Sequence, residues 1–256
     1  MIAVPPHKRV GHVVLVSGGA DSATVLGLAH RQYRKEFADG YQTHLYAFHC
    51  NYGQRTEQRE LKAFRDLCAH YGITEDFQYI IDINYLKQIG KSALTDSSIE
   101  VPIDGHAVVN RYVPVSYVPF RNGNLLSIAS SIASANRLSD IWIGVVQEDS
   151  SGYPDCRTEF ISFMNDAINA GLPDGQDVII RAPIIGMLKR DIIKHGREIN
   201  VPYELTWSCY QSEDKACGKC DSCRLRVRSF NELGLVDSIP YAIPWKEAVA
   251  LSEIKK

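Results

Sequence analysis

Residues 15–26 read LVSGGADSATVL, and this stretch decides the fold. An apolar run over 9–17 ends in two glycines, and a helix-forming segment follows at once. A buried strand, a glycine turn and a helix N-terminus together gather main-chain amides and partial positive charge in one concavity. The glycines let a ligand approach the main chain closely. Packing alone does not require so polar a turn, so we expect a phosphate or pyrophosphate group to bind there.

The side chains of this turn suit the same ligand. Ser17 and Ser22 can donate hydrogen bonds, and Asp21 can cap the helix or hold a Mg²⁺ ion that carries the phosphates. The pattern is neither a Walker loop nor a GxGxxG fingerprint, and a plain turn with an aspartate cap is the alternative. We expect Asp21 and Ser22 to act in catalysis. The predicted nucleotide-binding residues are Val16, Ser17, Gly18, Gly19, Ala20, Asp21, Ser22, Ala23, Thr24, Val25 and Leu26.

Strand and helix patterns alternate along the chain, which predicts a doubly wound, mostly parallel α/β sheet. Residues 84–119 are irregular and predict a connection over the active site. We expect an ATP-binding α/β domain over 1–200 and a four-cysteine segment with a C-terminal helix over 201–256. The predicted strands cover 9–17, 43–51, 75–82, 140–146 and 177–183.

Composition excludes several classes of protein. The 28 basic and 30 acidic residues give a net charge of −2, which argues against a protein that mainly grips nucleic acid. No window approaches the roughly 18 apolar residues of a membrane span. The first residues lack the apolar core of a secretion signal, so we expect a cytoplasmic protein with no membrane partner.

Four of the seven cysteines are clustered in the spacing C-x7-C-x2-C-x2-C. Two-residue gaps let thiolates converge on one ion, and four of them would close a tetrahedral, structural Zn²⁺ site. An iron–sulfur cluster is the main alternative, and unliganded thiols are a lesser one. Cys50 and Cys68 lie on apolar faces and are expected in the core, whereas Cys156 has polar neighbours. The predicted zinc ligands are Cys209, Cys217, Cys220 and Cys223.

Three further polar clusters lie where strands end or helices begin, at the ligand-binding rim of an α/β sheet, over residues 51–60, 118–126 and 149–160. Arg121 and Asn122 precede a helix of small residues and can meet phosphates or a carboxylate. Tyr153, Asp155 and Arg157 offer a ring face, an acceptor and a cation, which suit a flat heterocycle bearing a carboxylate. The alternative is a capped helix start, with Asp155 as the N-cap and Arg157 in solvent.

The motif SGGADS (17–22) resembles the phosphate loop of the PP-loop ATP pyrophosphatases, a superfamily with an adenine nucleotide α-hydrolase-like fold. Its members bind ATP there and adenylate a carboxylate or carbonyl oxygen. Together with YGQR (52–55), RN before a helix, SGYPDCR (151–157) and the late cysteines, the chain resembles the 7-cyano-7-deazaguanine synthase family over roughly 10–226.

This resemblance implies an ATP-dependent carbon–nitrogen ligase. It would convert 7-carboxy-7-deazaguanine and ammonia to the nitrile through an adenylated carboxylate and an amide. Arg55 and Asn122, with Tyr153, Asp155 and Arg157, would bind the acid. Arg121 and Lys189, the latter in PIIGMLKRDII (183–193), would meet the reacting anions. ATP, Mg²⁺ and Zn²⁺ are the implied cofactors, and a homodimer is the implied assembly.

The sequence departs from the family pattern in three places. Thr56 stands where the family has histidine, Ala20 stands where relatives often have glutamine, and 145–150 differs upstream of SGYPDCR. A paralogue acting on a related acid therefore stays open. A PP-loop tRNA thiolation enzyme, which needs a reactive cysteine and an RNA surface, is a second rival. A non-catalytic module that binds a partner through its cysteine knuckle is the third.

Overall fold

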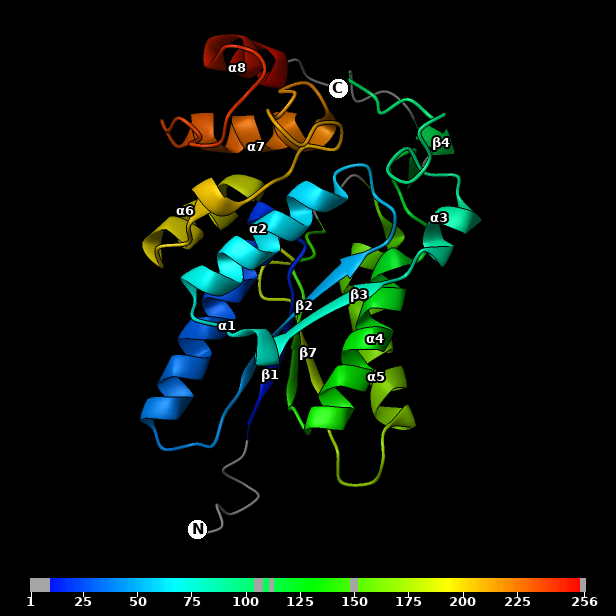
Figure 1. The fold of residues 1–256 in the computed structure, drawn as a ribbon, viewed down its shortest axis with the longest axis vertical. Helices are drawn as coiled ribbons and strands as arrows, with labels where there is room; N and C mark the ends of the chain where they lie inside the picture. Colours follow the sequence, from blue (N-terminus) through cyan, green and yellow to red (C-terminus); the bar gives the residue numbers. More distant parts are fainter. Residues whose placement is uncertain (1–9, 104–107, 111–112, 148–151, 254–256) are drawn as a thin grey trace.

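The computed structural model describes residues 10–103, 108–110, 113–147 and 152–253. Its centre is a parallel sheet in the order β3-β2-β1-β6-β7 (Figure 1), which confirms the predicted α/β fold. A separate antiparallel pair joins β4 and β5. The strands are β1 (His12–Leu15), β2 (Leu45–Asn51), β3 (Gln78–Asp82), β4 (Val108–Asn110), β5 (Val113–Pro114), β6 (Asp140–Trp142) and β7 (Ile179–Arg181).

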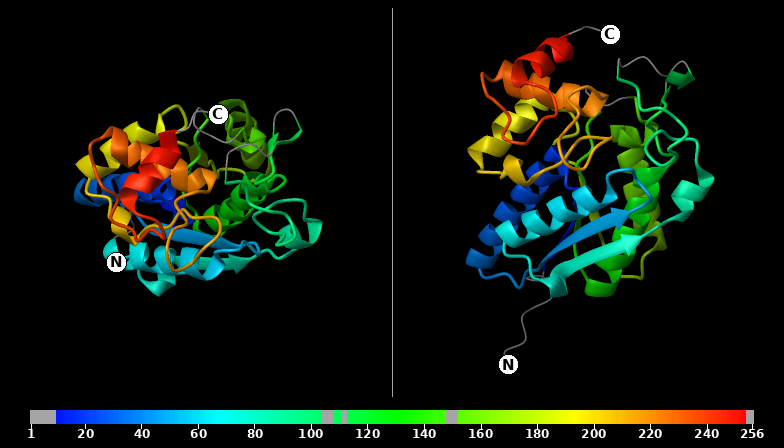
Figure 2. Two further views of the ribbon diagram at one scale, coloured as in Figure 1. Left: turned by 90° about the horizontal axis from the view of Figure 1, so that it is seen from above. Right: turned by 45° about the horizontal axis from the view of Figure 1, so that its top comes forward.

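Helices cover both faces of the sheet, as Figures 1 and 2 show. Helices α1 (Ala20–Ala38), α2 (Glu57–His70) and α6 (Lys189–Glu198) pack on one face, and α4 (Arg121–Asn136) and α5 (Thr158–Gly171) pack on the other. None of the helices in the described part of the chain is both long and apolar enough to cross a membrane.

Alternation along β1 divides the core between these two layers. Val13 and Leu15 join the cluster under α4 and α5, whereas Val14 and Val16 join the cluster under α1, α2 and α6. Successive side chains of a strand point to opposite faces. A central parallel strand is therefore buried on both faces, and all of the residues of β1 are buried, the polar His12 included.

The ligand-binding edge lies where the strand order reverses. The chain runs outward from β1 to β2 and β3, then returns to place β6 on the other side of β1. The crevice between β1 and β6 at their carboxyl ends is the usual binding site of such sheets. Gly144, just after β6, packs against the start of α1, where an added Cβ would lie 3.0 Å from the Ser22 nitrogen.

The C-terminal part of the chain lies above the carboxyl ends of the strands (Figure 1). It contains α7 (Asp221–Glu232) and α8 (Trp245–Glu253), and Phe230 of α7 packs in the same cluster as α1 and α2. The predicted boundary near residue 200 stays a prediction. The predicted C-terminal helix, over about 225–233, corresponds to α7. Helix α8 was not predicted, nor was the short α3 (Tyr85–Ile89) in the connection predicted as irregular. Residues 148–151 lie outside the described residues. They include part of 145–150, the stretch that differs from the family pattern.

A buried ion pair fixes α7 to the rest of the protein. Arg226 donates through Nε to Asp237 at 2.6 Å, and their side chains are 1% and 0% exposed. The same guanidinium donates to Thr206 Oγ1 at 2.7 Å and to the Tyr203 carbonyl at 3.0 Å. Tyr241 donates to Asp237 at 2.7 Å. Because these partners satisfy both charges, losing one charge leaves the other buried and uncompensated.

We therefore expect Asp237→Asn to lower the free energy of unfolding by about 3 kcal/mol, measured by urea denaturation. Asp39→Asn is the matched control, since the Lys35–Asp39 pair is exposed on both sides and its loss should change stability little. Equal effects of the two substitutions would contradict the role given to the buried pair.

Candidate functional site

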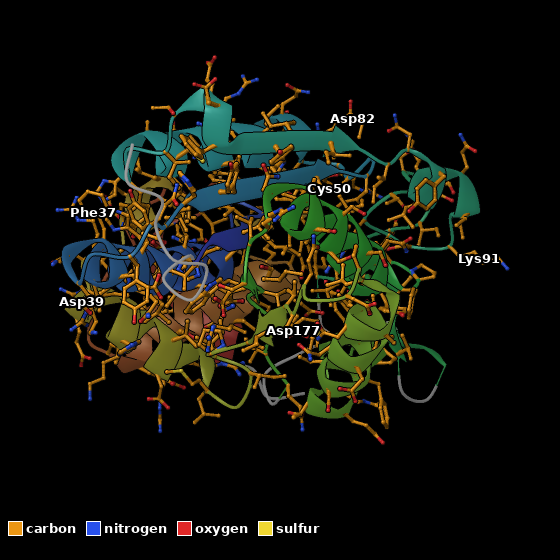
Figure 3. The ribbon with its side chains drawn as sticks, turned by 90° about the horizontal axis from the view of Figure 1, so that it is seen from below. Phe37, Asp39, Cys50, Asp82, Lys91 and Asp177 are labelled. Atoms are coloured by element: carbon orange, nitrogen blue, oxygen red, sulfur yellow. The ribbon has the colours of Figure 1, made fainter. Side chains whose placement is uncertain are left out.

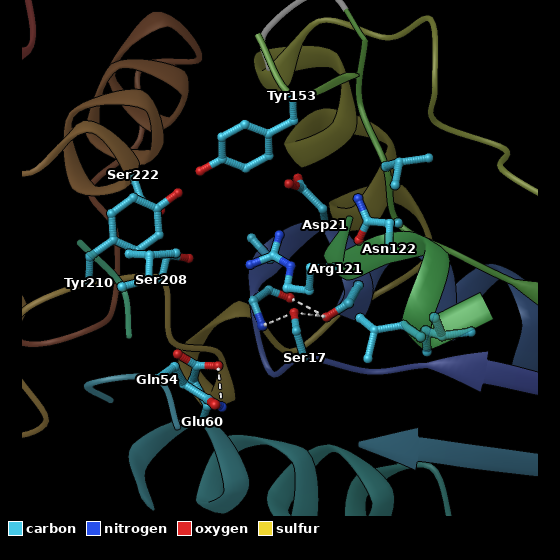
Figure 4. Close-up of a pocket in the computed structure, with 18 of the residues that line it drawn as sticks. Ser17, Asp21, Gln54, Glu60, Arg121, Asn122, Tyr153, Ser208, Tyr210 and Ser222 are labelled. Atoms are coloured by element: carbon cyan, nitrogen blue, oxygen red, sulfur yellow. Dashed lines mark hydrogen bonds between the residues drawn. The ribbon is translucent and has the colours of Figure 1, made fainter. Parts of the chain in front are cut away.

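A cavity of about 280 Å³ opens at the carboxyl ends of β1 and β6 (Figure 4). The loop after β1 forms one wall, the segment after β2 and the start of α2 form a second, and the start of α4 with Tyr153 forms a third. The cysteine segment closes it with Trp207, Ser208 and Tyr210, and α7 adds Ser222. Segments far apart in the sequence therefore meet at one site.

The loop after β1 is ordered by its own hydrogen bonds. Ser17 Oγ lies 3.1 Å from Ser22 Oγ and accepts from the Gly19 amide at 3.3 Å, and Ser22 Oγ donates to the Gly19 carbonyl at 3.0 Å. Helix α1 starts at Ala20 with Gly19 as its N-cap, and no described side chain caps it. Its first amides have no partner within the helix and are available to an anion.

Gly18 is required by both conformation and space. Its φ is +86°, and an added Cβ would lie 2.8 Å from the Glu60 carbonyl oxygen of α2. Its own carbonyl accepts a hydrogen bond from the Trp207 amide at 2.8 Å. The loop is therefore held between α2 and the cysteine segment by contacts that only glycine allows.

Of the predicted nucleotide-binding stretch, the residues Val16, Ser17, Gly19, Ala20, Asp21 and Ser22 line the cavity. Ala23, Thr24, Val25 and Leu26 are buried behind it in α1, where Thr24 Oγ1 lies 2.7 Å from the Tyr203 hydroxyl.

Asp21 and Lys189 meet at the cavity. Lys189 Nζ donates to Asp21 Oδ2, and the two side chains are 18% and 25% exposed. Asp21 Oδ1 is buried and has no hydrogen-bond partner among the described residues. Asp21 lies in the first turn of α1, so the interpretation of Asp21 as a helix cap is wrong. Lys189 opens α6, and its side chain is largely covered rather than solvated.

Arg121 faces the cavity between two aromatic rings. Its guanidinium carbon lies 5.4 Å from the centroid of Tyr52 and 5.9 Å from that of Tyr153, and NH1 donates to the Tyr52 hydroxyl at 3.1 Å. Burial raises the pKa of Tyr52, which therefore stays neutral. No carboxylate of a described residue lies within 4.0 Å of the guanidinium. The cation is positioned to meet an anionic ligand.

Asp155 orders the start of α4. Its Oδ2 accepts from the Asn122 amide at 2.9 Å, and Asn122 Nδ2 donates to the Asp155 carbonyl at 3.2 Å and to Cys156 Sγ at 3.3 Å. The alternative interpretation made Asp155 the N-cap of the helix that follows it, α5. The carboxylate instead accepts from the first turn of α4, which precedes Asp155 in the chain. Asn122 and Tyr153 line the cavity; Asp155 and Arg157 do not, and Arg157 is exposed.

Arg55 also lines the cavity, but main-chain carbonyls hold its guanidinium. It donates to the carbonyls of Ala93 at 2.7 Å, Asp96 at 2.8 Å and Ile99 at 2.5 Å. Arg55 therefore anchors the loop that follows α3. Its role in substrate binding stays a prediction.

The sequence analysis placed the polar stretch 51–60 at the ligand-binding rim but singled out only Arg55 from it as a site residue. Gln54, Thr56 and Glu60 line the cavity, and Thr56 Oγ1 donates to Glu60 Oε1 at 2.6 Å. The i, i+4 spacing of Thr56 and Glu60 at a helix start was the available signal. Ser208, Tyr210 and Ser222 were also missed, because the cysteine pattern drew attention to the metal ligands alone.

The four clustered cysteines converge as predicted. Their Sγ atoms all lie within 4.8 Å of one another, with Cys217 and Cys223 at 3.9 Å. Zn–S bonds of about 2.3 Å place sulfurs about 3.8 Å apart, so the set fits one tetrahedral ion. A four-iron cluster needs a larger separation of its thiolates. Amides of Cys217 and Cys220 point at ligand sulfurs at 3.4 and 3.3 Å.

The other three cysteines are buried. Cys50 lies among the side chains between the sheet and α4 (Figure 3), and Cys68 of α2 is fully buried in the core cluster that also includes α1 and α6. Burial raises the pKa of each of these thiols to about 12. Cys156 borders the cavity, and burial raises its pKa to about 11. All three thiols are therefore poor nucleophiles near neutral pH.

Known proteins with similar sequences show the family of this chain. A family model described as queuosine biosynthesis protein QueC matches residues 11–234. The chain is 49% identical over 229 residues to a 7-cyano-7-deazaguanine synthase of Nautilia profundicola, covering 90% of this chain and 97% of that protein. It is 48% identical to one of Nitratiruptor, with the same coverage.

A 4-thiouridine synthetase in an RNA complex with bound ATP has a TM-score of 0.48 at 16% identity, covering 95% of this chain and 50% of that one. That score is too low to support a conclusion about function.

We expect Cys220→Ser to lower the bound metal, measured by elemental analysis, and to reduce solubility. One thiolate fewer leaves the site open, and α7, which carries Ser222 into the cavity wall, loses its anchor. Cys68→Ser is the control, because that thiol lies far from the cluster in the core. Full activity of Cys220→Ser with no metal present would rule out a structural ion.

Proposed function

The chain belongs to the family of queuosine biosynthesis proteins QueC, and from this premise we propose that it is an ATP-dependent 7-cyano-7-deazaguanine synthase. Its substrates would be 7-carboxy-7-deazaguanine, ammonia and ATP. The family match extends over most of the chain, and the relatives are covered almost completely.

The observation that carries this proposal is the layout of the cavity. A phosphate loop at the start of α1 and the Asp21–Lys189 pair lie in the same cavity as Arg121, which has no described carboxylate partner. A reaction between ATP and a carboxylate must bring two anions together. Positive groups on both sides lower that repulsion and stabilise charge in the transition state.

In the first half-reaction, the α1 amides and Lys189 would hold the phosphates while Arg121 holds the acid. A carboxylate oxygen attacks the α-phosphorus, and pyrophosphate leaves with the electrons of the broken P–O bond. Ammonia then displaces AMP to give the amide. In the second half-reaction, the amide oxygen is adenylated in turn, and it departs with AMP as the nitrile forms.

A magnesium ion fits this arrangement. Asp21 Oδ1 is a buried oxygen with no described partner, and carboxylate oxygen is a ligand that Mg²⁺ prefers. Asp21 would hold the ion, which supplies charge neutralisation at the phosphates when bound. In the same way, Zn²⁺ is our proposal for the four cysteines. The homodimer and the cytoplasmic location stay predictions.

The thiolation alternative is less well supported. It needs a reactive cysteine, yet burial raises the pKa of Cys156, the thiol at the cavity, to about 11. Burial raises the pKa of Cys50 further, to about 12. The remaining alternatives, a related acid or a purely binding role, are separated from the proposal by the experiment below.

The direct test is mass spectrometry of the product from 7-carboxy-7-deazaguanine, ATP and ammonium, with AMP and pyrophosphate measured in parallel. We expect the nitrile, preceded by the amide at short times. Pyrophosphate release only with another 7-deazaguanine acid would favour the paralogue. Release dependent on RNA would favour the thiolase, and no release would leave a binding module.

We expect Asp21→Ala to reduce AMP formation by about 100-fold or more while the protein stays folded, because Lys189 loses its partner and the phosphates lose a ligand for their metal. Circular dichroism checks the fold. Asp191→Ala on α6 is the control, since Asp191 does not line the cavity. Unchanged turnover in Asp21→Ala would contradict the role given to this carboxylate.

A further inference from the structure

We propose that Glu60 is the group that takes protons from the nitrogen nucleophile, an inference that rests on the function proposed above. Glu60 lies in the first turn of α2, and its side chain lines the cavity. In Figure 4, Glu60 and Gln54 lie below and to the left of Ser17, and Tyr153 lies at the top of the view. Glu60 therefore belongs to the side of the cavity that carries the phosphate loop.

Two neutral donors hold the Glu60 carboxylate in one orientation. Thr56 Oγ1 donates to Oε1 at 2.6 Å, and Gln54 Nε2 donates to Oε2 at 3.2 Å. Gln54 is itself fixed, since its Oε1 accepts from the Tyr52 amide at 2.8 Å. No lysine, arginine or histidine nitrogen of the described residues lies within 4.0 Å of the carboxylate. Each oxygen keeps acceptor capacity for a small donor such as ammonium.

The carboxylate belongs to the same rigid wall as the phosphate loop. The main chain at Gly18 packs on the Glu60 carbonyl so closely that an added Cβ would lie 2.8 Å from it. On the other side, the Arg59 guanidinium carbon lies 4.4 Å from the Trp207 ring centroid, which fixes the same turn of α2 to the cysteine segment. A nucleophile bound at Glu60 is therefore beside the loop where the adenylate would form.

The titration of Glu60 suits proton transfer near neutral pH. Burial raises the pKa of Glu60 to about 7, against the opposing effects of the Thr56 hydrogen bond, the Arg121 charge and Gln54. Glu57 on the same helix raises it further, and Tyr52 faces it as a neutral phenol. A base with a pKa near the working pH can both accept a proton and release it to solvent.

The chemistry balances without another reagent. Ammonium gives a proton to the Glu60 carboxylate, and the free electron pair of ammonia attacks the carbonyl carbon of the acyl adenylate. A C–N bond forms, the C–O bond to AMP breaks, and AMP leaves with its electron pair. The amine nitrogen then loses a further proton to give the amide. In the second cycle, proton loss from nitrogen accompanies departure of AMP and formation of the nitrile.

The test compares Glu60→Gln with wild type and with the control Glu57→Gln, whose side chain lies on the same helix outside the cavity. Glutamine keeps the shape of Glu60 and an acceptor for Thr56 but cannot take a proton. Hydroxylamine is the second probe, because it is largely uncharged near neutral pH and attacks without first losing a proton. The three readouts are acid-dependent pyrophosphate release in a single turnover, amide formation from ammonium, and hydroxamate formation from hydroxylamine.

We expect Glu60→Gln to retain pyrophosphate release and hydroxamate formation within about threefold of wild type, and to lose about 100-fold or more in amide formation from ammonium. Wild-type amide formation should rise with pH as Glu60 deprotonates near the pKa of about 7. In Glu60→Gln this rise near pH 7 should be absent, and the rate of amide formation should recover only as free ammonia increases at higher pH. Glu57→Gln should behave as wild type within about twofold.

Equal losses with ammonium and hydroxylamine would overturn the proposal, because they would show that Glu60 only shapes the site. Unchanged amide formation in Glu60→Gln would overturn it as well. Failure of the proposed function has a different signature, since wild type itself would then release no pyrophosphate with the acid.

Discussion

The structure depends on the close approach of the main chain at Gly18 to two other segments. The carbonyl of Gly18 accepts from the Trp207 amide at 2.8 Å, and the space for a side chain is filled by the Glu60 carbonyl. This contact joins the end of β1, the start of α2 and the cysteine segment. The cavity exists because these segments converge on one residue without a Cβ, in a conformation that other residues rarely adopt.

The cysteine segment packs through Trp207 and Ala216 in a small core cluster, and two polar devices help to hold it over the sheet. Four thiols suited to one ion fix one end, and the Arg226–Asp237 pair fixes α7, the helix that carries Cys223 and begins just after Cys220. The ion pair satisfies its buried charges with hydrogen bonds, and a metal ion bound by the thiols would neutralise theirs. The segment supplies Ser208, Tyr210 and Ser222 to the cavity, so these structural interactions also shape the binding site.

The features predictable from sequence are those that local chemistry determines. The apolar run, glycine turn and helix start around residues 15–26 specify β1 and the phosphate loop, and short cysteine gaps specify convergent thiols. Features that depend on distant partners were not predictable. Asp155 caps a helix 33 positions earlier in the chain, and Arg55 donates hydrogen bonds to carbonyls 38 to 44 positions away. Nothing near either residue in the sequence distinguishes these roles from ligand binding.

The placement of charge in the cavity reconciles two opposing requirements. A carboxylate is needed where a nitrogen must lose protons, yet a fixed negative charge would repel the anionic phosphates and acid that share the cavity. Neutral donors on both Glu60 oxygens orient the group, and burial raises its pKa, which favours the uncharged form when the anions enter. The charge of Arg121 acts on Glu60, but the two side chains form no ion pair in the described structure. An ion pair would lower the pKa of Glu60 and make the carboxylate a weaker base. The same separation keeps the guanidinium available for an anion.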